Sequence, residues 1–158
     1  MPDLESDSRS YVLVVPFSVS GGNIEKWRPF ADQITREIIL KLRQIAGLRV
    51  IPASSAFTFK NNKTAAYIRV KLPDVHYLLD ATVSVEGNTR IQITAELESL
   101  INSDLVWNEH YLSRIDNTNF FSVQADIATS VSNSLKVVIL AKEKKVLSEL
   151  TTSNFAAY

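Results

Sequence analysis

The run Tyr11–Phe17, with the sequence Tyr-Val-Leu-Val-Val-Pro-Phe, constrains the fold of this chain more than any other stretch. It is short, almost wholly apolar and rich in β-branched residues, and Pro16 ends it before it reaches the length of a helix. An apolar run without alternating polar residues is typical of a strand buried on both faces. Such strands lie in the middle of α/β sheets, so we expect Tyr11–Phe17 to be a central strand with helices on both sides.

Helices and strands are predicted to alternate after this strand. Apolar residues recur at steps of three and four between Phe30 and Ile45, which predicts a helix with Pro29 in its first turn. The short apolar segment Leu48–Pro52 is expected to be the second strand. Thr64 is placed to cap a short helix that follows.

Three segments are predicted to lack regular structure. The polar residues 1–10 are expected to form a linker. Ser18–Asn23 contains Gly21-Gly22 and is expected to be a flexible loop. Ser54–Lys60 combines two phenylalanines with polar residues and shows no clear period, so we expect it to be less regular than its neighbours.

The spacing of apolar residues changes from helical to alternating after Val75. Val75–Glu86 is therefore predicted to be a strand, with Gly87-Asn88 as a hairpin turn behind it. In the next strand, the apolar residues face one way and the polar residues between Arg90 and Glu98 face the other. We expect this polar face to contact water. Leu105–Arg114 is predicted to be the last strand.

The apolar residues Val123, Ile127, Val131, Leu135 and Val138 recur at steps of three or four and predict a long helix at the end of the chain. This helix is expected to start near Asn119, to reach about Leu150 and to be broken by Thr151–Asn154. The predicted order is therefore β-α-β-α-β-β-β-α. With right-handed crossovers, this order gives an α/β fold with a five-stranded mixed sheet of strand order 2-1-3-4-5 and helices on both faces. A chain of 158 residues has room for one domain, which we place at residues 11–150.

Composition excludes several functions. Seventeen basic residues balance seventeen acidic ones, so the chain lacks the positive charge typical of nucleic-acid binders. The sequence has no cysteine, which excludes disulfides, thiolate metal sites and cysteine nucleophiles. Direct membrane insertion is not expected, because no apolar stretch reaches the roughly 18 residues of a membrane helix.

No catalytic motif is found, and we expect neither an enzyme nor a cofactor or metal site. The chain lacks the nucleophile elbow and the phosphate loop, and Gly21-Gly22 is a lone glycine pair. His76 and His110 have no partner at metal-binding spacing and are interpreted as surface or rim residues, although a shared site is an alternative. Asp80, in an apolar run, is the most interesting acid; its simpler interpretation is a strand residue hydrogen-bonded to a neighbouring loop.

If a ligand binds, the carboxyl ends of the parallel strands at the switch in strand order are the expected place. The candidate ligand-binding residues are Phe17, Ser18, Ser54 and Ser55. In the alternative interpretation, the two serines at 54 and 55 cap turns and the nearby phenylalanines only pack.

The last strand is predicted to lie at the edge of the sheet, with no Lys or Pro between Leu105 and Leu112 to protect it. It carries three candidate interface residues, Trp107, Asn108 and Tyr111. We expect this edge to pair with a second copy in a homodimer, the alternative being that the long carboxy-terminal helix covers it.

Eight segments, which together cover roughly Tyr11 to Val138, resemble one bacterial family. They are Val14-Val15-Pro16-Phe17, Phe30-Ala31-Asp32, Gly47-Leu48-Arg49-Val50-Ile51, Ser54-Ser55-Ala56-Phe57-Thr58-Phe59-Lys60, Tyr77-Leu78-Leu79-Asp80-Ala81-Thr82-Val83, Ile91-Gln92-Ile93-Thr94-Ala95-Glu96-Leu97, Val106-Trp107-Asn108-Glu109-His110-Tyr111 and Gln124-Ala125-Asp126-Ile127-Ala128. The family is the TolB amino-terminal-like domain of membrane-bound adenylyl cyclases and CadC-type transcriptional regulators.

The resemblance implies a non-catalytic sensory or coupling domain of a larger bacterial signalling protein, which binds protein partners or its own neighbouring domains. The effector before it would be a cyclase or a winged-helix domain, and residues 151–158 resemble the start of a following tetratricopeptide-like repeat. The implied location is the periplasmic side of an inner-membrane protein, with the cytoplasm as the alternative. Three other functions are alternatives: an envelope scaffold like the TolB translocation protein, a small hydrolase or transferase, and an RNA-binding domain.

Overall fold

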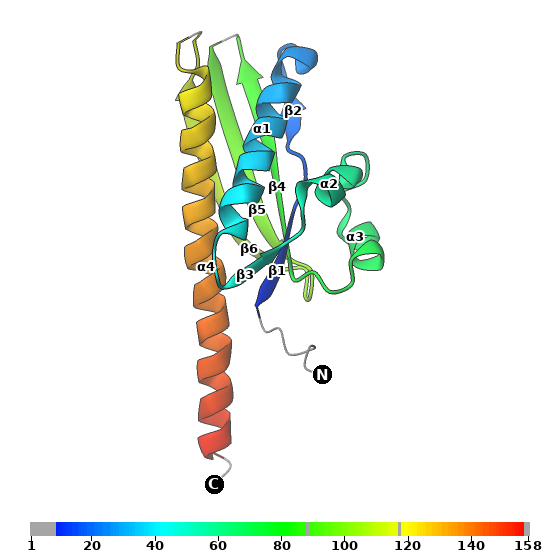
Figure 1. The fold of residues 1–158 in the computed structure, drawn as a ribbon, viewed down its shortest axis with the longest axis vertical. Helices are drawn as coiled ribbons and strands as arrows, with labels where there is room; N and C mark the ends of the chain where they lie inside the picture. Colours follow the sequence, from blue (N-terminus) through cyan, green and yellow to red (C-terminus); the bar gives the residue numbers. More distant parts are fainter. Residues whose placement is uncertain (1–8, 88, 117, 157–158) are drawn as a thin grey trace.

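The computed structural model describes residues 9–87, 89–116 and 118–156, with side chains as far as residue 142 (Figure 1). The elements follow one another as β1 (Ser10–Val14), β2 (Ser18–Ser20), α1 (Ile24–Arg43), β3 (Leu48–Val50), α2 (Ala53–Ala56), the 3-10 helix η2 (Phe57–Phe59), α3 (Ala65–Lys71), β4 (Tyr77–Glu86), β5 (Arg90–Ser99), β6 (Leu105–Arg114) and α4 (Phe120–Ala156).

The sheet has the strand order β3-β1-β4-β5-β6, and β2 pairs with β4 beyond the end of β1. β1 lies between β3 and β4 and runs parallel to both, with Leu13 opposite Leu78 and Tyr11 opposite Arg49. The pairs β4–β5 and β5–β6 are antiparallel. The predicted mixed sheet, its strand order and the central place of the first strand are therefore confirmed.

Helices α1 and α4 pack side by side over one face of the sheet, as Figure 1 shows. Their buried apolar residues match the stripes in the sequence: Phe30, Ile34, Ile38 and Leu42 in α1, and Val123, Ile127, Val131 and Leu135 in α4. The crossover that contains α2 and α3 connects β3 to β4, which lie on opposite sides of β1. A right-handed connection between these strands is expected on the face opposite α1. Its first part still contacts α1, because Phe57 of η2 lies against Arg36, and Ile68 of α3 is buried in the core.

An aromatic cluster joins the two large helices at the end near the β4–β5 hairpin. The ring of Phe30 is perpendicular to that of Trp27 at a centroid distance of 5.4 Å and meets Phe120 of α4 at 4.9 Å. Phe30 and Trp27 are fully buried. Edge-to-face contacts of this kind add to the burial of the rings, so the cluster fixes α4 against α1.

The second face of the sheet is only partly covered. Along β5, the apolar side chains are buried beneath α1 and α4, whereas Arg90, Gln92 and Glu96 on the opposite face are exposed. The predicted water-facing side of this strand is therefore confirmed. No helix within the described part of the chain is long and apolar enough to cross a membrane.

The apolar run at the start is not one continuous strand. β1 ends at Val14, although the N–H of Val15 still donates to the carbonyl of Leu79 at 3.1 Å. Pro16 has no N–H and interrupts the ladder. The chain then returns to β4 as β2, so the prediction of a loop from Ser18 is wrong for Ser18–Ser20.

The glycines after β2 lie close to the sheet. Gly21 has a φ of +75°, and a Cβ atom there would lie 2.6 Å from the carbonyl oxygen of Val85. Only glycine can adopt this conformation so close to another backbone. The segment predicted to be a flexible loop therefore packs against β4.

Further boundaries differ from the predictions: β3 ends at Val50 rather than Pro52, and β4 begins at Tyr77 rather than Val75. α1 begins at Ile24, before Pro29, because Asn23 caps it by accepting a hydrogen bond from the N–H of Lys26. The segment predicted to be irregular forms α2 and η2, and Thr64 caps α3 as expected. Ser10, assigned to the linker, is the buried first residue of β1; residues 1–8 lie outside the described part.

The predicted break in the last helix is also wrong, because α4 continues through Thr151–Asn154 to Ala156. These residues disfavour a helix by less than about 1 kcal/mol each, and neither glycine nor proline is present to end it. Figure 1 shows the carboxy-terminal half of α4 extending past the sheet. The assignment of residues 151–158 to a following repeat stays a prediction.

Candidate functional site

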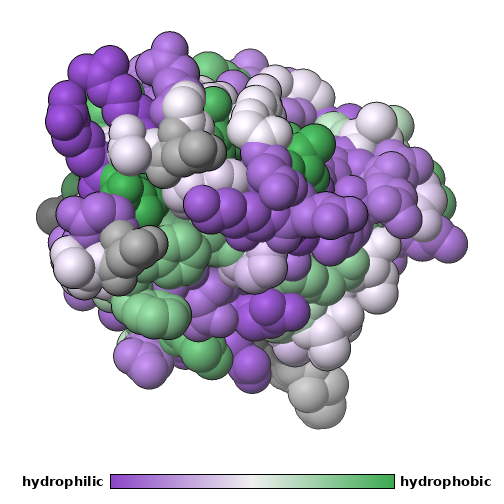
Figure 2. All heavy atoms as spheres, turned by 90° about the horizontal axis from the view of Figure 1, so that it is seen from above, coloured by the Kyte–Doolittle hydropathy of each residue, from purple (hydrophilic) through white to green (hydrophobic). Residues whose placement is uncertain are grey.

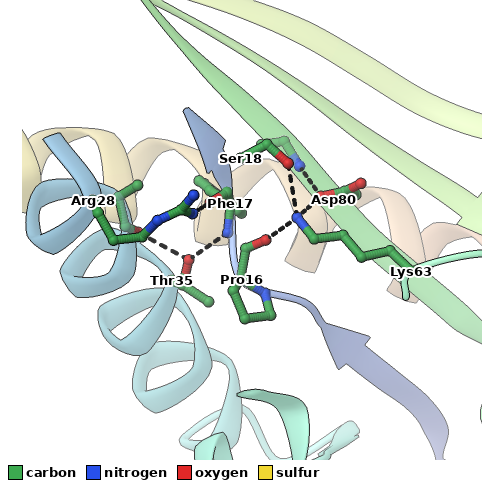
Figure 3. Close-up of polar contacts among 9 residues, drawn as sticks. Pro16, Phe17, Ser18, Arg28, Thr35, Lys63 and Asp80 are labelled. Atoms are coloured by element: carbon green, nitrogen blue, oxygen red, sulfur yellow. Dashed lines mark hydrogen bonds and ion pairs between the residues drawn. The ribbon is translucent and has the colours of Figure 1, made fainter. Parts of the chain in front are cut away.

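The switch in strand order lies at the end of β1, and the side chain of Lys63 reaches this point (Figure 3). The ammonium group of Lys63 donates hydrogen bonds to the carbonyl of Pro16 and to Oγ of Ser18, the latter at 2.9 Å. It also lies 3.4 Å from Oδ1 of Asp80 on β4. We call these four residues the switch-point cluster. One side chain from the loop before α3 thus joins the β1–β2 connection, β2 and β4.

Asp80 is the acid of this cluster. Burial raises the pKa of its carboxyl group, and the charge of Lys63 and the N–H of Ala81 oppose that rise. The N–H of Ala81 donates to Oδ1 of Asp80 at 2.8 Å. The interpretation of Asp80 as a strand residue bonded to a neighbouring loop is therefore confirmed.

Phe17 is held on the helix side of the same junction. Its N–H donates to Oγ1 of Thr35 at 3.1 Å, and its carbonyl accepts from the guanidinium group of Arg28 at 3.1 Å (Figure 3). Thr35 in turn donates to the carbonyl of Ala31. The side chain of Phe17 is fully buried. The polar groups of Phe17 are therefore satisfied within the protein.

Ser54 and Ser55 are exposed on α2. Among the contacts of the described residues, none joins these serines to Phe17 or Ser18. The two phenylalanines that follow pack as the simpler interpretation expected: Phe59 is buried, and Phe57 lies under the guanidinium group of Arg36 at 4.5 Å. A ligand-binding role for the four predicted residues stays a prediction.

The histidines and acids do not converge. Nδ1 of His76 accepts the N–H of Tyr11 at 2.8 Å and joins β1 to the start of β4. His110 lies on β6, 3.1 Å from Oγ1 of Thr94. Within the described residues, no three histidine or acidic side chains come together as a metal site.

A groove that the sequence did not reveal lies on the water-facing side of β4, β5 and β6, near the β4–β5 hairpin. Its volume is about 590 Å³. It is lined by Ser84, Glu86, Arg90, Ile91, Gln92, Leu112, Ser113 and Arg114. Figure 2 looks onto the end of the molecule that lies at the top of Figure 1, where hydrophilic and hydrophobic residues are interspersed.

The strand register places three charged residues of this groove in one row. Glu86 of β4 is opposite Arg90 of β5, and Arg90 is opposite Arg114 of β6. All three side chains are exposed. The alternating pattern of β5 is enough to place Arg90 on the water-facing side of the sheet. It does not show that Glu86 and Arg114 flank Arg90, because this depends on the register of β4 and β6.

The three predicted interface residues lie on β6, which is an edge strand as expected. Trp107 and Tyr111 are opposite Leu97 and Ile93, so they lie on the face covered by α4, whereas Asn108 is exposed on the other face. Burial raises the pKa of Tyr111 to about 12. α4 thus covers side chains of β6, and among the described residues no strand pairs with its outer edge.

The direction of the backbone groups on that edge follows from one hydrogen bond. The N–H of Ile115 donates to the carbonyl of Thr89 at 2.7 Å, which makes these residues a hydrogen-bonded pair. Pairs alternate along an antiparallel ladder. The N–H and C=O groups of Asn108, His110 and Leu112 therefore point away from β5.

Comparison with known proteins gives one relative by sequence and several by fold. No family model matches the chain. It is 30% identical over 145 residues to "Putative adenylate cyclase 3" of Rhizobium meliloti (strain 1021), an alignment that covers 91% of this chain and 24% of that protein. The chain thus spans about a quarter of the length of the curated relative that it matches.

Two solved structures share the fold. Lipoprotein GNA1162 from Neisseria meningitidis is 19% identical with a TM-score of 0.52, over 80% of this chain and 99% of that one. A PelC dodecamer from Paraburkholderia phytofirmans is 18% identical with a TM-score of 0.51, over 83% of this chain and 88% of that one. At these identities, the likeness shows the fold alone.

Proposed function

We propose that this chain is a non-catalytic coupling domain of a larger bacterial signalling protein of the adenylate cyclase kind. The carrying observation is the alignment that takes up 91% of this chain but only 24% of the cyclase relative. The same fold fills 99% of the chain of lipoprotein GNA1162, so it can exist as a self-contained unit. The same fold is thus almost a whole protein in lipoprotein GNA1162 but matches only a quarter of the cyclase relative. In the relative it is therefore best explained as one domain joined to others.

In this proposal, the domain is of the TolB amino-terminal-like kind and lies on the periplasmic side of an inner-membrane protein. It contacts protein partners or its own neighbouring domains, and α4 leads toward tetratricopeptide-like repeats. The sequence resemblance also supports a second kind of parent protein, a CadC-type regulator in which the effector is a winged-helix domain. The second candidate is an envelope scaffold, which the shared fold with lipoprotein GNA1162 favours.

A domain exchange in the Rhizobium meliloti relative tests this function. The segment of the relative that matches this chain would be replaced by residues 1–158, and formation of cyclic AMP from ATP would be measured. We expect the chimera to keep the cyclase activity of the relative, deletion of the segment to change that activity several-fold, and the isolated chain to form no cyclic AMP. Cyclase activity in the isolated chain would refute the proposal, and an activity indifferent to deletion would favour the scaffold.

We also propose that the outer edge of β6 pairs with β6 of a second copy. The backbone N–H and C=O groups of Asn108, His110 and Leu112 point away from β5. Two such edges can pair in antiparallel orientation about a two-fold axis.

The variant Asn108→Lys is expected to convert this dimer to a monomer. The new charge stands at the edge without removing an apolar side chain, and edge lysines are a common protection against strand pairing. Light scattering at increasing protein concentration would measure the mass of wild type and variant. Asn133→Lys, at an exposed asparagine of α4, is the matched control and should remain dimeric. A monomeric wild type, or equal behaviour of the two variants, would contradict the proposal.

A further inference from the structure

We propose that the groove on the water-facing side of β4, β5 and β6 binds a small anionic molecule, with a carboxylate or phosphate group held between Arg90 and Arg114. This site lies away from the switch-point cluster, and it does not depend on the proposed coupling function. Three features of the groove support it: the charge of one row, the spacing within that row, and the chemistry of the residues beside it.

The row is electrically unbalanced. Glu86, Arg90 and Arg114 are consecutive across three strands, so one negative charge stands beside two positive ones. Among the described residues, neither guanidinium group forms an ion pair or a hydrogen bond. The groove therefore presents a net positive charge with free N–H donors.

The spacing of the two arginines makes this imbalance unfavourable. Ile115 and Thr89 form a hydrogen-bonded pair, so the adjacent pair Arg90–Arg114 is a non-hydrogen-bonded one. Side chains approach most closely in such pairs, with Cβ atoms roughly 4.5–5.5 Å apart, and like charges there destabilise a sheet. An anion between the two guanidinium groups removes this repulsion and receives charge-assisted hydrogen bonds from both.

The neighbouring row defines the rest of the ligand. Ser84, Gln92 and Leu112 are consecutive across the same three strands, and all three line the groove. Gln92 and Ser84 offer hydrogen bonds, while Leu112 is 78% exposed and offers an apolar surface. The volume of about 590 Å³ is within the usual range for small-molecule sites. The ligand class is therefore a small molecule with an anionic group and a short apolar part.

The test uses the whole chain and three probes: inorganic phosphate, succinate and octanoate. Each probe is titrated at constant ionic strength, set with sodium chloride, while the amide shifts of the protein are recorded by NMR. We expect changes centred on the groove residues, saturable for at least one probe. Arg114→Gln should weaken that binding roughly tenfold or more, because a charge-assisted contact is lost. Stronger binding of octanoate than succinate would identify a carboxylate with an apolar chain, and preference for phosphate would identify a phosphate ester.

A second readout separates binding from a merely structural effect. Without a probe and at low salt, Arg114→Gln should raise the melting temperature, because it relieves the repulsion in the row. The saturating probe should raise the melting temperature of the wild type but not that of the variant. Arg43→Gln, at an exposed arginine of α1, is the control and should bind the probe like the wild type. No saturable change with any probe, or equal loss in the control, would overturn the proposal.

Discussion

Replacing Phe30 with alanine is expected to lower the free energy of unfolding by about 3–5 kcal/mol, a large part of the stability of a domain of this size. The ring is fully buried and packs edge-to-face against Trp27 and Phe120. Its removal leaves a cavity between α1 and α4, which two helices anchored to one sheet cannot close by collapsing. Urea denaturation followed by circular dichroism would measure the loss.

The control for this experiment is Phe121→Ala. Phe121 is the next aromatic residue of α4 but has 79% of its surface exposed. Its removal should cost less than about 1 kcal/mol, because little surface leaves a packed environment. If the two variants lose similar stability, the aromatic cluster does not hold α4 against α1.

The variant Lys63→Met is expected to lower the free energy of unfolding by about 2 kcal/mol at neutral pH. It removes the donor that Pro16, Ser18 and Asp80 share. Loss of a fully buried partner typically costs about 3–5 kcal/mol. A smaller value is expected because 41% of the Asp80 side chain is exposed and water screens its charge. Denaturation of wild type and variant at pH 7 gives the difference.

This loss should depend on pH in a defined direction. Burial already raises the pKa of Asp80 in the folded protein above 3.8. The native state then binds more protons than the unfolded state just above pH 3.8, so the contribution of Asp80 to stability falls as pH rises through its folded pKa. Removing Lys63 raises that pKa further. The penalty of Lys63→Met should therefore be largest at neutral pH and shrink as the solution is acidified toward pH 3.8.

A double-mutant cycle with Asp80→Asn isolates the ion pair. In the Asp80→Asn background, Lys63→Met leaves no unpaired carboxylate and should cost less than it does in the wild type. The remaining cost would come from the hydrogen bonds to Pro16 and Ser18. Equal losses in both backgrounds would mean that Asp80 is not coupled to Lys63, contrary to the 3.4 Å contact between them.

The candidate sites show where prediction from sequence stops. The open-sheet rule led to Phe17 and Ser18, and the structure places both at the switch in strand order. That rule does not show that Lys63 fills this point, because Lys63 lies in a loop without any periodic signal. The two arginines of the groove carry no local signal either, since they are separated by 24 positions and meet only through the register of β5 and β6.

Local patterns in the chain were enough to predict the type and order of the main elements. Apolar spacing is a local property, so the stripes of α1 and α4 and the alternation of β5 were legible residue by residue. The strand order followed from the handedness of crossovers, which is a general property of L-amino acids. The return of the chain to β4 after Pro16, the partners of Lys63 and the row of charges in the groove became visible only in three dimensions. These features depend on contacts between residues far apart in the chain, and no local pattern encodes which of the available partners packing brings together.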